Sequence, residues 1–113
     1  MLLIESARRM APSLSRDTPV VYILQLGTGA LYVGCTTDLK VRLREHAVGT
    51  ACRTSSLDPP DALVFVEIQP DFRTARKREL HIKRWSHAKK LALIDHQDAN
   101  LRRLSSHETD AVE

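Results

Sequence analysis

Two tyrosines, Tyr22 and Tyr32, are the first side chains along this sequence that could act on a ligand together. They lie in Val20–Gly34, where two apolar runs flank the turn residues Gly27–Gly29. Side chains alternate between the faces of a strand, so two even-numbered tyrosines in a hairpin share a face. Diagonal neighbours across such a pair lie roughly 7–8 Å apart. The pattern predicts either two hydroxyls converging on a site or ordinary strand residues, because tyrosine also favours β-strands.

A three-residue loop at Gly27–Gly29 would also fix the register of this hairpin. In that register Leu24 lies opposite Tyr32, and Tyr22 lies opposite Gly34. Because glycine has no side chain, we expect open space beside Tyr22 at this position.

The predicted helix after the hairpin, Leu39–Ala47, carries a second candidate pair. Arg42 and His46 are four residues apart and therefore lie on one side of the helix. A guanidinium offers phosphate a planar, permanently charged set of donors, and an imidazole can exchange a proton near neutral pH. The same spacing is also common on solvent-exposed helix surfaces.

A second predicted helix places a carboxylate among apolar residues. Ala75, Glu79 and Ile82 occupy positions i, i+4 and i+7, which lie on one side of a helix. A buried carboxylate is unfavourable unless it is paired or binds a cation. Two interpretations remain open for Glu79: a structural ion pair with Arg42, or an oxygen ligand for magnesium, which keeps several waters when a protein binds it.

Positive charge is concentrated in the same region. The chain has a net charge of +3, but Arg73–Lys90 holds eight lysines or arginines and one acidic residue, Glu79. Such a segment favours a polyphosphate partner, although a solvated helix surface would have the same composition.

These residues must be positioned by a small α/β domain. Capping residues precede the first helix, Gly49 ends it, and two prolines close the polar loop before the third strand. The predicted order is β-β-α-β-α-α, with a three-stranded sheet flanked by helices. The predicted strands are 20–26, 30–35 and 62–69, and the predicted helices are 39–47, 74–85 and 87–94.

Composition sets the limits of this domain. The chain has 113 residues, of which 42% are hydrophobic and 27% charged, as expected for one globular domain. We expect a flexible extension at 1–19, the domain at 20–94 and a polar tail at 95–113 that is frayed or only partly helical. The sequence shows no apolar run near the ~20 residues of a membrane span and no clear secretion signal. Cys35 and Cys52 fit free thiols, so the expected location is the cytoplasm.

The ordered set of these elements resembles the GIY-YIG nuclease superfamily, and most of all its small bacterial stand-alone members. The resemblance covers about residues 20–94 and implies the GIY-YIG fold. The segments that carry it are Val21–Ile23 and Tyr32–Gly34 for the two halves of the signature, and Asp38–His46 and Arg78–Ile94 for the helices that follow.

The resemblance also implies roles for individual residues. Tyr22 and Tyr32 match the signature tyrosines that surround the attacking water, and one of the two is a proposed general base. Arg42 matches the arginine that stabilises the developing phosphorane charge, and His46 matches an accessory group for phosphate binding or proton transfer. Glu79 matches the metal-binding glutamate, with Mg²⁺, or Mn²⁺ as a substitute, as the implied cofactor.

Some positions depart from the family pattern. Gly34 matches the glycine that closes the signature, but Val21 replaces the glycine of its first half. Ser55 and Ser56 stand where relatives often carry Thr-Arg, and a late asparagine found in some members has no evident match. No second DNA-binding domain is recognised, so basic side chains are expected to contact backbone phosphates rather than bases. These side chains are Arg76, Lys83, Arg84, Lys89 and Lys90.

The sequence therefore predicts a metal-dependent endonuclease that hydrolyses DNA phosphodiester bonds. The expected partner is branched or single-stranded DNA, with little sequence specificity and a role in DNA repair or processing. Two alternatives remain open: a nucleic-acid-binding module that keeps the fold with little turnover, and a subunit that docks on a larger repair protein.

Overall fold

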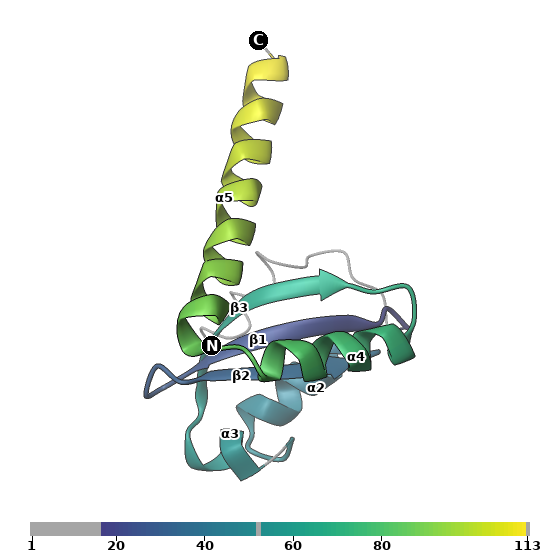
Figure 1. The fold of residues 1–113 in the computed structure, drawn as a ribbon, viewed down its shortest axis with the longest axis vertical. Helices are drawn as coiled ribbons and strands as arrows, with labels where there is room; N and C mark the ends of the chain where they lie inside the picture. The colour runs from purple at the N-terminus through teal and green to yellow at the C-terminus, as the bar shows by residue number, and fades with distance from the viewer. Residues whose placement is uncertain (1–16, 52, 113) are drawn as a thin grey trace.

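A computed structural model of the protein describes residues 17–51 and 53–112. Within these residues, three antiparallel strands form one sheet in the order β2-β1-β3, flanked by helices (Figure 1). This architecture confirms the predicted α/β fold. The strands are β1 (Val20–Leu26), β2 (Leu31–Thr36) and β3 (Pro60–Ile68), and the helices are α2 (Leu39–Ala47), α3 (Arg53–Leu57), α4 (Phe72–Lys83) and α5 (His87–Val112).

The β1–β2 hairpin has the register that the sequence predicts. Leu24 pairs with Tyr32 and Tyr22 pairs with Gly34. The Leu26 amide donates to the Ala30 carbonyl at 2.8 Å, which closes the three-residue loop. Gly29 in this loop has φ of 92°, a conformation that glycine adopts without steric cost.

β1 is the central strand, and its alternating side chains supply a core on each face of the sheet. The face that carries Tyr22 packs against α2 through Leu39 and Leu43. The opposite face packs against α4 through Ala75 and Ile82. Every side chain of β1 except that of Gln25 is buried, as expected for a strand covered on both faces.

Aspartates begin the two helices that cover the sheet. The Asp38 carboxylate accepts from the Val41 amide, and the Asp71 carboxylate accepts from the Thr74 amide. The bounds of α2 agree with the predicted helix, and Gly49 follows it with φ of 80°. Helix α4 begins and ends two residues earlier than predicted, because the Asp71 cap sets its start.

Two details of the segment between α2 and β3 differ from the prediction. Part of the expected loop at 50–60 is the short helix α3, and β3 begins at Pro60 instead of Ala62. The sheet order explains the second difference, since β3 is an edge strand. A proline is tolerated at the first residue of an edge strand because its missing N–H breaks no ladder bond.

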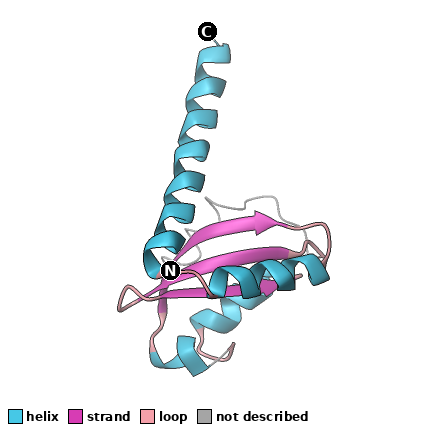
Figure 2. Ribbon diagram, in the orientation of Figure 1, coloured by secondary structure: helices cyan, strands magenta, loops and turns pink. Residues whose placement is uncertain are grey.

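Helix α5 is longer than expected, and the predicted helix end at Ile94 is wrong. It continues to Val112 and extends away from the sheet (Figure 2). The span contains no glycine or proline, so polar composition alone does not end the helix. Gln97 fixes its first turns to the edge of β3: its amide accepts from the Val66 N–H at 3.2 Å and donates to the Val66 carbonyl at 2.6 Å. No helix in the described part of the chain is both long and apolar enough to cross a membrane.

Residues 1–16 and Cys52 lie outside the described residues. The predictions of a flexible N-terminal extension and of a free Cys52 thiol therefore remain predictions. Cys35 is a free cysteine, as predicted.

Candidate active site

The Tyr22 ring lies directly over the backbone of Gly34. A Cβ atom built on Gly34 would stand 2.5 Å from the Tyr22 Oη and 2.6 Å from its Cζ. The space that the sequence led us to expect beside Tyr22 is therefore filled by the phenol of Tyr22 itself. Glycine is required at position 34 because any larger residue would displace this ring.

Tyr22, Tyr32 and His46 form one group of rings on the α2 face of the sheet. The ring centroids of the tyrosines are 6.4 Å apart, and that of Tyr32 is 5.0 Å from that of His46. The Tyr22 hydroxyl lies 2.9 Å from the His46 Nε2. Tyr22 is 1% exposed, whereas Tyr32 is partly exposed. The predicted convergence of the two phenols is present, with His46 against both.

His46 is a buried imidazole that stays neutral at physiological pH. Only 1% of the residue is exposed. Burial, and to a smaller extent the nearby Arg42 charge, lower its pKa from 6.5 to about 4, while Glu45 opposes the shift. The His46 Nδ1 is buried without a hydrogen-bond partner among the described residues. The Nε2–Oη bond is therefore the polar contact that fixes this ring.

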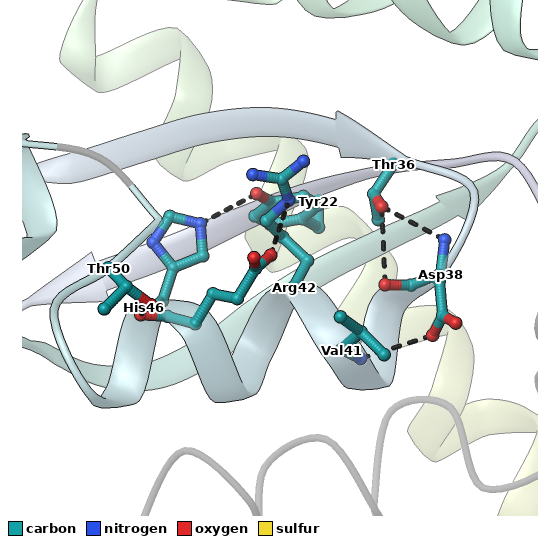
Figure 3. A network of polar contacts seen from close by, with 8 residues as sticks. Tyr22, Thr36, Asp38, Val41, Arg42, His46 and Thr50 are labelled. Atoms are coloured by element: carbon teal, nitrogen blue, oxygen red, sulfur yellow. Dashed lines mark hydrogen bonds and ion pairs between the residues drawn. The ribbon is translucent and has the colours of Figure 1, made fainter.

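Arg42 lies one turn before His46 and remains accessible. Figure 3 shows both side chains directed from the same side of α2 towards Tyr22. The Arg42 Nε is 3.6 Å from the Glu45 Oε1, and the two side chains are 39% and 42% exposed. An exposed pair of this kind is weak, so Arg42 can exchange Glu45 for an incoming phosphate at little cost.

Glu79 is buried on α4, and its partners differ from the predicted one. The residue is 3% exposed. Its Oε1 accepts from the Arg76 Nη1 at 2.6 Å, and its Oε2 lies 3.2 Å from the Lys83 Nζ. The possible ion pair with Arg42 is thus replaced by cations three and four residues away on the same helix, a spacing that brings side chains together.

The sequence reasoning missed Cys35 as a neighbour of Glu79. The Cys35 Sγ donates to the Glu79 Oε1 at 3.4 Å. Burial and then the adjacent Glu79 carboxylate raise the pKa of this thiol to about 11, against an opposing effect of Arg76, so the group stays protonated. Side chains alternate along β2, so the sequence could have placed Cys35 on the face of the sheet opposite to Tyr32 and Gly34.

The two groups of candidate residues lie on opposite faces of the sheet. The tyrosines belong to the core cluster with α2, whereas Cys35, the hydrogen-bond partner of Glu79, packs with the cluster under α4. Gly34 and Cys35 are consecutive in the edge strand β2, so the two groups meet across that edge.

The basic residues of α4 and α5 are divided among several partners. Arg76 and Lys83 contact Glu79, and their side chains are 55% and 44% exposed. The Lys89 Nζ lies 4.2 Å from the centroid of the Trp85 ring. Arg84 follows the end of α4 and is exposed, and Lys90 is partly exposed. The predicted phosphate-binding residues thus include two that already neutralise a buried carboxylate.

Trp85 and Arg78 form a contact that the sequence did not predict. The Arg78 guanidinium lies 5.3 Å from the Trp85 ring centroid and makes two hydrogen bonds to the Glu67 carboxylate, at 2.8 and 3.2 Å. These contacts join β3, α4 and the segment before α5. Arg78 is therefore a structural residue despite its place in the basic segment.

The sequence model of the GIY-YIG catalytic domain matches residues 18–92 of this chain. The chain belongs to the GIY-YIG family. The resemblance carried by the two tyrosines and the helices after them is thereby confirmed. The matched residues span the sheet, the first helices and the beginning of α5.

The chain is also similar to small bacterial proteins. It is 32% identical over 80 residues to a UPF0213 protein of Streptococcus sanguinis strain SK36, a match that covers 71% of this chain and 92% of that protein. A UPF0213 protein of Staphylococcus aureus strain Mu3 is 35% identical over 78 residues, 69% of this chain and 95% of that protein. The solution NMR structure of a UPF0213 protein from Bacillus halodurans has 32% sequence identity and a TM-score of 0.46, and the match covers 69% of this chain and 83% of that one.

The residues around Glu79 fit a single-carboxylate metal site better than a multi-ligand one. In the described part of the chain, no group of three or more His, Cys, Asp or Glu side chains could hold a metal ion. Magnesium, however, can be bound through one carboxylate together with water and substrate phosphate. Both Glu79 oxygens are paired with positive groups, so a metal would have to displace those groups to bind there. Glu79 is the residue that would hold a metal here, and Arg76 and Lys83 occupy its oxygens in this structure.

Proposed function

We propose that this protein is a metal-dependent endonuclease that hydrolyses DNA phosphodiester bonds. Membership of the GIY-YIG family, whose members are generally endonucleases, supports this class of reaction. The observation that carries the proposal is the hydrogen bond between the Tyr22 hydroxyl and the His46 Nε2, with Tyr32 and the accessible Arg42 beside it.

In the proposed reaction, Tyr22 and Tyr32 hold the attacking water against the phosphorus. The bond from water oxygen to phosphorus forms as the bond to the leaving oxygen breaks. The proton that the water loses passes to solvent, and solvent supplies a proton to the leaving oxygen. Arg42 stabilises the negative charge that develops on the non-bridging oxygens. A bound divalent metal would supply further stabilisation of that charge from Glu79.

His46 is a positioning residue in this scheme. A group with a pKa of about 4 is a poor proton acceptor at neutral pH. It instead holds the Tyr22 hydroxyl in one orientation through the 2.9 Å bond. An oriented phenol keeps an oxygen lone pair directed at the water without reorganisation during the reaction.

The proposed substrate is branched or single-stranded DNA, cleaved with little sequence specificity during repair or processing in the cytoplasm. Basic side chains at the surface, including Arg76, Lys83 and Arg84, would contact the phosphate backbone. Such contacts carry no sequence information.

Cleavage assays with branched, single-stranded and duplex DNA, with and without Mg²⁺, test this proposal. Glu79→Gln, which keeps the side-chain shape, should abolish Mg²⁺-dependent cleavage and leave DNA binding largely intact. Glu67→Gln is the matched control, because it removes a carboxylate paired with Arg78 outside the site and should retain cleavage. Equal cleavage by wild type and Glu79→Gln would remove Glu79 from the mechanism.

A second candidate function is a nucleic-acid-binding module with little turnover, acting alone or as a subunit of a repair complex. The observation that favours it is the neutralisation of Glu79 by Arg76 and Lys83, which leaves no carboxylate oxygen of Glu79 unpaired. Wild-type protein that binds all three DNAs but cleaves none of them, at any Mg²⁺ concentration, would establish this function instead.

A further inference from the structure

Arg76 and Lys83 connect a buried carboxylate with the surface of the molecule. The Glu79 side chain is 4% exposed, whereas the side chains of Arg76 and Lys83 are 55% and 44% exposed. A carboxylate this deeply buried requires compensating charge. Each of its oxygens has one cation, at 2.6 Å from Arg76 and at 3.2 Å from Lys83. The cations lie where a ligand in solution can also reach them.

These two cations and a divalent metal must compete for the same oxygens. A metal bound to Glu79 would bring two further positive charges next to a guanidinium and an ammonium group, and like charges at this distance repel. The guanidinium and the ammonium therefore disfavour metal binding for as long as they remain on the carboxylate.

Phosphate offers both cations another partner. Arginine binds a phosphate group with two parallel hydrogen bonds, and lysine binds it as a point charge. Both side chains are long enough to turn outwards while their backbone stays in α4. A phosphate that withdraws them from Glu79 would leave the carboxylate with an unbalanced negative charge, which a divalent cation can then balance.

We propose that Arg76 and Lys83 are positioning residues that hold Glu79 in the free protein and transfer to nucleic-acid phosphate, so that phosphate binding opens Glu79 to a divalent metal. This inference rests on the proposed function and adds an order of binding to it: nucleic acid binds first and the metal second. Metal and nucleic acid are then thermodynamically coupled, and each raises the affinity for the other by the same factor.

The test measures Mn²⁺ affinity directly, from the electron paramagnetic resonance signal of free Mn²⁺, and needs no cleavage. Without nucleic acid, Arg76→Gln and Lys83→Gln should each raise Mn²⁺ affinity by at least about fivefold, the lower end of typical coupling between sites. Lys77→Gln is the matched control: it removes the same charge from the exposed neighbour of Arg76, and it should change Mn²⁺ affinity by less than about twofold.

A second arm adds a short phosphorothioate oligonucleotide, which resists hydrolysis and keeps its backbone charge. Wild-type Mn²⁺ affinity should rise by at least about fivefold, and this rise should largely disappear in the double variant Arg76→Gln/Lys83→Gln. The Glu79→Gln variant with the same oligonucleotide measures the Mn²⁺ that the nucleic acid binds by itself. This amount is subtracted from the wild-type value. Thermal melting of each variant verifies that it is folded.

The outcomes separate this inference from the proposed function. If neither charge-removing variant binds Mn²⁺ more tightly than Lys77→Gln does, the inference is overturned, even if the wild type cleaves DNA. If both variants bind Mn²⁺ more tightly but the wild type cleaves no DNA, the competition at Glu79 stands while the endonuclease proposal fails.

Discussion

On the α2 face of the sheet, a phenol and a neutral imidazole are buried together, whereas on the α4 face a carboxylate is buried with two cations. Tyr22 and His46 are each 1% exposed, and Glu79 is 3% exposed. The same depth of burial is thus reached by removing charge in one region and by balancing charge in the other. Both solutions avoid an isolated buried charge, which would be far more costly.

The difference decides what each region can respond to. The Tyr22–His46 pair changes when a proton enters, because protonation would place an unbalanced charge in the core. The contacts of Glu79 change when Arg76 and Lys83 bind another anion, because these two side chains balance its charge and also reach solvent. The α2 face should therefore be sensitive to pH, and the α4 face to phosphate and metal ions.

The largest effect expected from this contrast is a loss of stability at low pH that depends on His46. The folded-state pKa of about 4 lies below the ordinary value of 6.5. Between these values the unfolded chain binds a proton at His46 and the folded chain does not, so the free energy of unfolding decreases as the pH falls. The contribution is complete above pH 6.5 and is lost towards pH 4, a difference of about 3 kcal/mol.

Urea unfolding at a series of pH values, compared between wild type and His46→Gln, measures this contribution. The variant keeps a polar side chain but cannot titrate, so its stability should depend less on pH in this range. Parallel pH profiles for the two proteins would show that burial does not hold His46 neutral, and the contrast between the faces would fail.

A smaller effect is expected from Gly34→Ala, which tests how tightly the α2 face is packed. The new methyl group would meet the Tyr22 ring at 2.5–2.6 Å and force it away from His46. Overpacking of this kind typically costs about 1–3 kcal/mol, measurable by denaturant unfolding. In a Tyr22→Leu background the ring is absent, so the same substitution should cost much less. An equal cost in both backgrounds would place the strain elsewhere than on Tyr22.

The α2 side of the site was the more predictable of the two from sequence. Strand alternation and the glycine loop are local patterns, so they were sufficient to place Tyr22 and Tyr32 on one face and to pair Tyr22 with Gly34. The spacing of Arg42 and His46 placed both on one side of α2. The bond between His46 and Tyr22 joins residues 24 positions apart, and no local pattern specifies it.

The α4 side was less predictable because it depends on which helix covers which face of the sheet. Sequence periodicity marked Glu79 as buried, and the structure confirms that. Periodicity did not show that α4 lies across the sheet from the tyrosines, so Arg42 was considered as a partner of Glu79. The true partners, Arg76 and Lys83, stand at i−3 and i+4 from Glu79, a spacing that was available in the sequence.

The smallest expected effects separate burial from charge as the cause of the His46 pKa. Arg42 lowers this pKa and Glu45 raises it, but burial contributes most. Arg42→Gln should therefore raise the His46 pKa and Glu45→Gln should lower it, each by much less than the whole shift. Both side chains are about two-fifths exposed, at 39% and 42%, so solvent screens their charges. NMR titration of the His46 ring protons measures both changes.

The same two variants should leave the free energy of unfolding within about 0.5 kcal/mol of the wild-type value, because an exposed ion pair contributes little. If Arg42→Gln instead returned the His46 pKa to near 6.5, charge rather than burial would keep the imidazole neutral. Charged neighbours would then determine the protonation state of His46, just as Arg76 and Lys83 balance the charge of Glu79 on the α4 face. A small shift in each direction would show that the two faces do stabilise their buried polar groups by different means.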